Sequence, residues 1–125
     1  MEPGAILSAP CDVLAPCALG GILNDATIPE LQCRIVAGAA NNQLADPVHG
    51  EKLHERGILY APDYVINAGG IIVTAAELEG ADAAKAKRDV ERISSNIEWV
   101  YAEARRQGLS TAAAANRITD ALLHK

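Results

Sequence analysis

Aromatic residues are almost absent from this sequence of 125 residues: they make up 3% of it, phenylalanine does not occur, and Trp99 is the only tryptophan. The core must therefore be built from Ala, Val, Ile and Leu, which suits the close-packed layers of an α/β fold better than an aromatic-rich β-sandwich. Long hydrophobic runs are absent as well, since none approaches the roughly 18–20 residues that cross a membrane. Residues 1–4 lack the basic region of a secretory signal. We expect a cytoplasmic protein with no membrane partner.

Basic residues are fewer than acidic ones: the sequence has 11 Lys and Arg and 16 Asp and Glu, which gives a net charge of −5. Nucleic acid is therefore not an expected partner, because surfaces that bind it are rich in Lys and Arg. Three scattered cysteines, Cys11, Cys17 and Cys33, form no CxxC pair and are interpreted as reduced thiols. His49 and His54 are not spaced four apart as helical zinc ligands would be, so the sequence predicts no metal site.

Three short apolar runs in the first half are each bounded by a proline or glycine, and they contain β-branched or large apolar residues. This pattern is typical of buried strands. The runs cover residues 11–15, 34–37 and 58–61. Helix signals separate them: a capping box at residues 27–30 predicts a short helix, and Asp46 with Gly57 brackets a helix over residues 47–56. Strands alternating with helices indicate an α/β fold with three parallel strands and flanking helices.

The second half is predicted to be helical, with helices over residues 68–79, from Asp82 to near Gly108, and from Ser110 onward. The long helix carries one apolar stripe in steps of four and three residues. Two interpretations are open: the stripe is a dimer seam, or it packs against the chain's own domain, which its short length favours. The residues of the stripe are Ala86, Val90, Ile93, Ile97, Val100 and Ala104.

Glycine-rich and polar segments follow each predicted strand, at residues 16–21, 38–43 and 62–70. Because the carboxyl ends of parallel strands meet at one edge of a sheet, these loops should converge where open α/β sheets bind ligands. Asparagine amides there offer both a donor and an acceptor. Asp63 either polarises Asn67 or bonds to its own backbone in a turn, and the turn is favoured.

The three segments CDVLAPCALGG (residues 11–21), AGAANNQL (37–44) and GILYAPDYVINAGG (57–70) together resemble the glutamate/leucine/phenylalanine/valine amino-acid dehydrogenase family. The resemblance is closest to the leucine, valine and phenylalanine branch, because the glutamate branch typically has Asn-Gly-Pro where this chain has Asn41-Asn42-Gln43. The resemblance implies oxidative deamination of a branched-chain or aromatic L-amino acid to the 2-oxo acid, with NAD as cofactor.

The resemblance also implies roles for individual residues. Asn41 should reach the nicotinamide ribose, and Asn67 should contact the substrate carboxylate and the nicotinamide. Two residues, Ile71 and Thr74, match positions that line the substrate side-chain pocket. The dinucleotide should be bordered by the backbone and apolar atoms of Cys17, Ala18 and Leu19.

Several parts of such an enzyme are not found in these 125 residues: the GxGxxG turn, the catalytic lysine and the proton-shuttling aspartate. The chain therefore resembles the last third of the enzyme, a partial Rossmann-like fold. Residues 1–80 would form the second half of a dinucleotide-binding domain and residues 81–125 a C-terminal helical segment with two helices. We expect no catalytic residue in it and no activity for it alone, while the complete enzyme would be a homo-oligomer. The alternatives are a non-catalytic interaction or regulatory module, or the complementing half of a split dehydrogenase.

Overall fold

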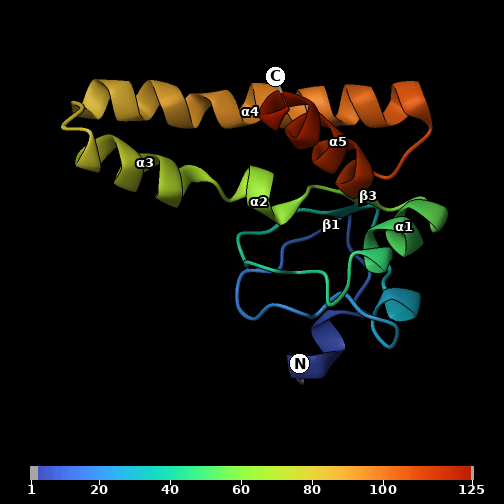
Figure 1. The fold of residues 1–125 in the computed structure, drawn as a ribbon. Helices are drawn as coiled ribbons and strands as arrows, with labels where there is room; N and C mark the ends of the chain where they lie inside the picture. The colour runs from blue at the N-terminus through green and yellow to red at the C-terminus, as the bar shows by residue number, and fades with distance from the viewer. Residues whose placement is uncertain (1–2, 125) are drawn as a thin grey trace.

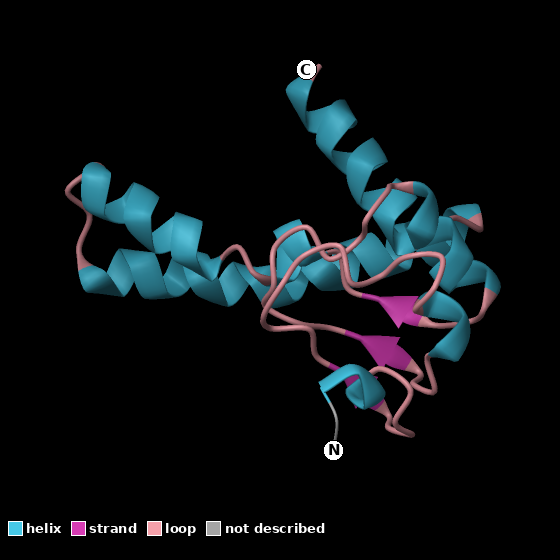
Figure 2. Ribbon diagram, turned by 90° about the horizontal axis from the view of Figure 1, so that it is seen from below, coloured by secondary structure: helices cyan, strands magenta, loops and turns pink. Residues whose placement is uncertain are grey.

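The computed structural model describes residues 3–124 and contains a three-stranded parallel sheet. The strands are β1 (Val13–Leu14), β2 (Ile35–Val36) and β3 (Leu59–Tyr60), in the order β1-β2-β3. Val13 lies opposite Ile35, which lies opposite Leu59, and Figure 2 shows the three arrows pointing the same way. The parallel arrangement predicted from the sequence is confirmed, although each strand is shorter than its apolar run.

The connection between β1 and β2 contains only a 3-10 turn, η2 (Ile28–Glu30), and a second such turn, η1 (Pro3–Ile6), precedes β1. The predicted capping box is wrong, because the Thr27 side chain does not cap η2. The side-chain oxygen of Asn24 instead accepts the backbone N–H groups of Ala26 at 3.0 Å and Thr27 at 3.1 Å. Asparagine readily bonds the backbone two or three residues ahead. The Thr27 hydroxyl is itself engaged, because it accepts the Asn24 N–H at 3.1 Å and donates to the Ile22 carbonyl, and the Glu30 N–H bonds the Thr27 carbonyl at 3.0 Å.

Helix α1 (Val48–Glu55) joins β2 to β3 and ends as predicted. The Asp46 carboxylate accepts the Val48 N–H at 3.0 Å at its start. At its end Gly57 has φ +70°, and the Ile58 N–H donates to the Leu53 carbonyl at 2.9 Å. This is a Schellman motif, which a glycine closes without steric cost.

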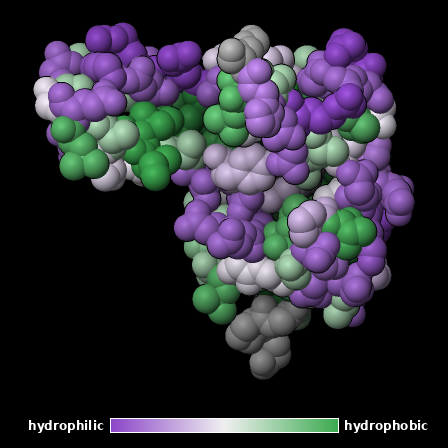
Figure 3. All heavy atoms as spheres, in the orientation of Figure 1, coloured by the Kyte–Doolittle hydropathy of each residue, from purple (hydrophilic) through white to green (hydrophobic). Residues whose placement is uncertain are grey.

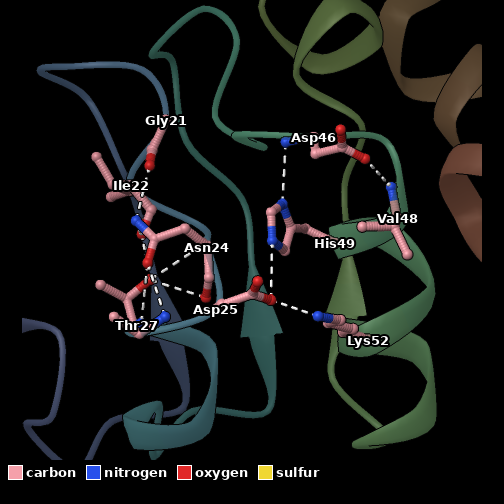
Figure 4. A network of polar contacts seen from close by, with 10 residues as sticks. Gly21, Ile22, Asn24, Asp25, Thr27, Asp46, Val48, His49 and Lys52 are labelled. Carbon is pink, nitrogen blue, oxygen red and sulfur yellow. Dashed lines mark hydrogen bonds and ion pairs between the residues drawn. The ribbon is translucent and has the colours of Figure 1, made fainter.

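A network of polar contacts fixes α1 to the segment before η2 (Figure 4). The buried His49 ring accepts the Asp46 N–H at Nδ1, 2.9 Å away, and its Nε2 lies 3.2 Å from the Asp25 carboxylate. Lys52 also pairs with Asp25. Because Nδ1 is an acceptor, the ring proton lies on Nε2, and this N–H donates a hydrogen bond to the Asp25 carboxylate. These contacts hold the pKa of Asp25 below its ordinary value.

The main core lies between the sheet, η2 and α1. Burying a Leu, Ile or Val side chain fully is worth about 1.5–3 kcal/mol, so this cluster supplies most of the apolar stabilisation of residues 11–62. We call residues 11–62 the sheet region. The core residues are Leu14, Leu23, Ile28, Leu31, Val36, Leu53, Ile58, Tyr60 and Ala112, of which Leu23, Val36 and Leu53 are fully buried.

Beyond β3 the chain is helical: α2 (Asp63–Ile66), α3 (Gly69–Leu78), α4 (Ala83–Gln107) and α5 (Thr111–Leu123). The short helix α2 was not predicted. Asp82 caps α4 by accepting the Lys85 N–H at 2.7 Å, and Gly108 ends it with φ +66°. Ser110 caps α5 by accepting the Ala113 N–H at 3.1 Å. These caps are confirmed.

Helix α3 folds back along α4 to form an extension beside the sheet, and α5 crosses α4 nearer the sheet (Figures 1 and 2). We call residues 69–96, which are α3 and the part of α4 beside it, the arm. Helix α4 contacts α2, α3 and α5, and Val100 and Ala104 of its apolar stripe are buried, so this end of the stripe packs within the chain. The other four residues of the stripe are half-buried. Within residues 3–124, no helix is both long enough and apolar enough to cross a membrane.

Candidate functional site

A hollow of about 610 Å³ lies at the carboxyl edge of the sheet, between the segments that follow β2 and β3. Two of the three predicted loops therefore meet there, as the parallel topology requires. The hollow is open to the surface and carries amide and carboxylate groups as well as apolar ones. Its lining is Ala39, Asn41, Asn42, Asp63, Tyr64, Asn67, Ala68, Gly70 and Ile71.

Two asparagines meet in this hollow. The Asn67 side-chain amide donates to the Asn41 side-chain oxygen at 2.6 Å and lies 3.4 Å from the Ala39 carbonyl. Asn67 ends α2, and Asn41 lies in the loop after β2. The other half of each amide, an acceptor on Asn67 and donors on Asn41, forms no hydrogen bond with residues 3–124. A ligand carboxamide, hydroxyl or carboxylate can use these groups.

The loop after β1 lies against the loop after β2. The Gly21 N–H donates to the Asn42 carbonyl at 2.7 Å, and the Ala40 N–H donates to the Pro16 carbonyl at 2.9 Å. A Cβ atom at Gly38 would lie 2.1 Å from the Pro16 carbonyl oxygen, so no other residue fits there. The second loop is thus held between the first loop and α2.

The structure brings Asn41, Asn67 and Ile71 together and leaves the other predicted site residues outside the lining of the hollow. Thr74 is exposed on α3 and donates to the Gly70 carbonyl at 3.1 Å. The side chains of Cys17, Ala18 and Leu19 are exposed in the first loop.

The sequence profile of the Glutamate/Leucine/Phenylalanine/Valine dehydrogenase family matches residues 1–123. The chain belongs to this family. It is 51% identical over 120 residues to the leucine dehydrogenase of Geobacillus stearothermophilus, a match that covers 96% of this chain and 33% of the relative. It is 51% identical over 109 residues to the valine dehydrogenase of Streptomyces coelicolor, covering 87% of this chain and 30% of the relative.

The crystal structure of L-tryptophan dehydrogenase from Nostoc punctiforme superimposes with a TM-score of 0.92 at 49% sequence identity, and the match covers 96% of this chain and 37% of that one. The chain therefore spans about a third of the length of the curated relatives it matches. The family resemblance inferred from the three motifs is confirmed.

A buried polar group in the segments that follow β2 and β3 was not predicted from the sequence. Gln43 is fully buried, and its side-chain amide donates to the carbonyls of Gly38 at 2.8 Å and Ala40 at 2.9 Å. Its neighbour is Asp63, whose side-chain oxygens accept the Gln43 backbone N–H at 3.1 Å and the Tyr60 hydroxyl at 3.2 Å. Gln43 follows the turn formers Asn41 and Asn42 in a polar segment, so the sequence carries no signal for its burial.

Asp63 therefore fits neither interpretation from the sequence: its carboxylate bonds neither Asn67 nor a turn of its own. It is 7% exposed. Burial, together with the negative charge of Asp63, raises the pKa of the Tyr60 hydroxyl far above its ordinary value, so Tyr60 keeps its proton. Within residues 3–124, no group of three His, Cys, Asp or Glu side chains could hold a metal ion.

Proposed function

We propose that this chain supplies the NAD-binding part of an amino-acid dehydrogenase that oxidatively deaminates a branched-chain or aromatic L-amino acid. Residues 1–80 would be the second half of the dinucleotide-binding domain, and residues 81–125 the C-terminal helical segment. The observation that carries the proposal is the hydrogen-bonded pair of Asn41 and Asn67 in the hollow at the carboxyl edge of the sheet. Its support is the membership of the chain in the dehydrogenase family.

The residues present fit a nicotinamide dinucleotide. The free donors of Asn41 suit a ribose hydroxyl, and the free acceptor of Asn67 suits a carboxamide. When bound, NAD supplies the hydride acceptor. In this proposal Cys17, Ala18 and Leu19 border the dinucleotide through backbone and apolar atoms, and Asn67 orients the substrate.

The substrate side chain would meet Ile71, which is 75% exposed at the rim of the hollow, and Thr74 one turn further along α3. Neither residue offers a cation, and burying an unpaired carboxylate is costly. We therefore propose an apolar substrate side chain in preference to that of glutamate.

The purified 125-residue chain should not form NADH from leucine, valine or phenylalanine. Hydride transfer needs the nicotinamide, the substrate and a proton acceptor held together, and a positioned acid or base alone contributes about 10²–10⁴-fold. None of these 125 residues is proposed for that role. Turnover that follows the purified chain and disappears in the Asn67→Ala variant would contradict the proposal that the chain carries only part of the machinery.

A chimera tests the site itself. Residues 1–125 would replace the matching C-terminal third of the Geobacillus stearothermophilus leucine dehydrogenase, with which they share 51% identity. In this chimera Asn67→Ala removes hydrogen bonds to charged or reacting groups, worth about 1.5–3 kcal/mol, so kcat/KM with leucine should fall about 10- to 150-fold. Asn96→Ala is the matched control, because Asn96 is an exposed amide on α4 outside the hollow. A change of less than twofold for Asn67→Ala would exclude the proposed role.

A further inference from the structure

The two asparagines of the hollow come from segments 26 residues apart, and one aspartate is bonded to both segments. Asp63 begins α2, and its backbone carbonyl accepts the Asn67 N–H at 2.9 Å at the end of the same helix. Its side-chain Oδ2 accepts the Gln43 N–H at 3.1 Å in the loop that carries Asn41. Asp63 therefore links the two segments and fixes the position of Asn41 relative to Asn67.

Gln43 holds the same loop from its inner side. Its Nε2 donates to the carbonyls of Gly38 and Ala40, which flank Ala39. The Ala39 carbonyl in turn lies 3.4 Å from the Asn67 amide. Because both partners of Nε2 are carbonyls, the orientation of the Gln43 amide is settled by its hydrogen bonds. The side chain thus shapes the three residues that lead into Asn41.

The Asp63 carboxylate is buried, and no Lys or Arg of residues 3–124 pairs with it. Each of its oxygens instead has one donor, the Gln43 N–H on Oδ2 and the Tyr60 hydroxyl on Oδ1. A buried carboxylate without a cation depends on such donors, so this group cannot move without losing them. The end of β3, the start of α2 and the loop after β2 are therefore coupled through one side chain.

We infer that Asp63 and Gln43 are positioning residues for the nicotinamide and amino-acid site, and that they set the separation of Asn41 and Asn67. The inference rests on the proposed function of the hollow. Gln43 is fully buried. Asp63 borders the hollow, but it is 7% exposed and each of its carboxylate oxygens already accepts from a protein donor, so both residues act through the asparagines.

The test uses four variants of the 125-residue chain. Gln43→Met keeps the length of the side chain and removes the two donors, and Asp63→Ala removes both acceptors. Asp63→Asn is the rescue variant, because its oxygen can still accept the Gln43 N–H while its amide donates to the Tyr60 oxygen. Ser110→Ala is the stability control: Ser110 is 1% exposed and caps α5 away from the hollow, so its loss lowers Tm without touching either loop.

The readout is the nuclear Overhauser cross-peak between the Asn67 side-chain amide protons and the Asn41 side chain. It should be lost in Gln43→Met and Asp63→Ala, retained in Asp63→Asn, and retained in Ser110→Ala even though its Tm falls. A cross-peak that survives in both Gln43→Met and Asp63→Ala would overturn the inference. Equal loss in Ser110→Ala would overturn it too, because general destabilisation would then explain the result.

NADH added to the same samples separates this inference from the proposed function. In the wild-type chain NADH should shift the Asn41 and Asn67 amide signals, and its apparent Kd should rise at least about tenfold in Gln43→Met but less than twofold in Ser110→Ala. A wild-type chain that shows no shift would count against the proposed function, and the cross-peaks would still decide the positioning role.

Discussion

The sheet region and the arm differ in what holds them together. The core of the sheet region is assembled from residues distant in sequence, each at most 9% exposed, whereas in α3 only Ala76 is buried. Apolar side chains remain on the outside of the arm, where Leu78 is 86% and Ile71 75% exposed (Figure 3). The sheet region therefore depends on packing between distant segments, while the arm depends on the contact between α3 and α4 and on the Asp82 cap.

The largest expected effect is a contrast between two leucines. Leu53→Ala in α1 removes a fully buried side chain and should lower the free energy of unfolding by about 2–5 kcal/mol, because it leaves a cavity in the core. Leu78→Ala in α3 removes an exposed side chain and should change it by no more than about 0.5 kcal/mol. Urea unfolding monitored at Trp99 measures both. A comparable loss from Leu78→Ala would mean that the arm is packed as firmly as the sheet region.

Cap removal should give a smaller contrast. Ser110→Ala should cost about 1–2 kcal/mol, since Ser110 is buried, caps α5 and donates to the Glu51 carboxylate at 2.6 Å. Asp82→Ala should cost about 0.5–1 kcal/mol, because its cap is exposed. Asp82→Ala should also speed amide exchange at Lys85 without changing exchange at β2. Faster exchange at β2 would show that the two regions unfold together.

The smallest expected effect is on acid stability. Lys52 and His49 hold the pKa of Asp25 below its ordinary 3.8, and Lys85 does the same for Asp89 in the arm. A lowered folded pKa means that the contribution to stability is present above pH 3.8 and is lost as the pH falls through the folded value. Below about pH 4 the decrease of Tm with falling pH should therefore become smaller in Asp25→Asn, and by more than in Asp89→Asn. The reason is that the Asp25 carboxylate has two partners, one of them buried.

Salt provides the control for the pH comparison. The Asp25 carboxylate is exposed and that of Asp89 is half-exposed, so both contacts should weaken as ionic strength rises. Identical acid curves for wild type and both variants would show that neither contact contributes to stability.

Local signals were sufficient to predict much of the fold. Helix caps act on donors and acceptors within a few residues, so they could be inferred from neighbouring sequence. This holds for Gly57, Asp82, Gly108 and Ser110. The parallel sheet followed from the alternation of runs and helices. The prediction at Thr27 failed because its hydroxyl bonds the Asn24 N–H and the Ile22 carbonyl instead of the Glu30 N–H, a choice between two local patterns that the sequence leaves open.

The site was predictable only in part. The meeting of Asn41 and Asn67 follows from the parallel topology, which places the ends of neighbouring strands together. Helix α2 was missed because a helix of four residues has little propensity of its own. Its first residue, Asp63, is held instead by Tyr60 and Gln43.

Gly70 is a position where the need of the fold for glycine can be tested separately from the need of a ligand for it. It lies in a helix and on the rim of the hollow, and apart from its own helix and chain neighbours no atom of residues 3–124 comes within 4 Å of where its Cβ would be. Packing does not demand glycine there, and alanine should raise the stability of α3 by up to about 1 kcal/mol. In Gly70→Ala, a gain in Tm that accompanies weaker NADH binding would support the proposed binding of the dinucleotide close to this backbone.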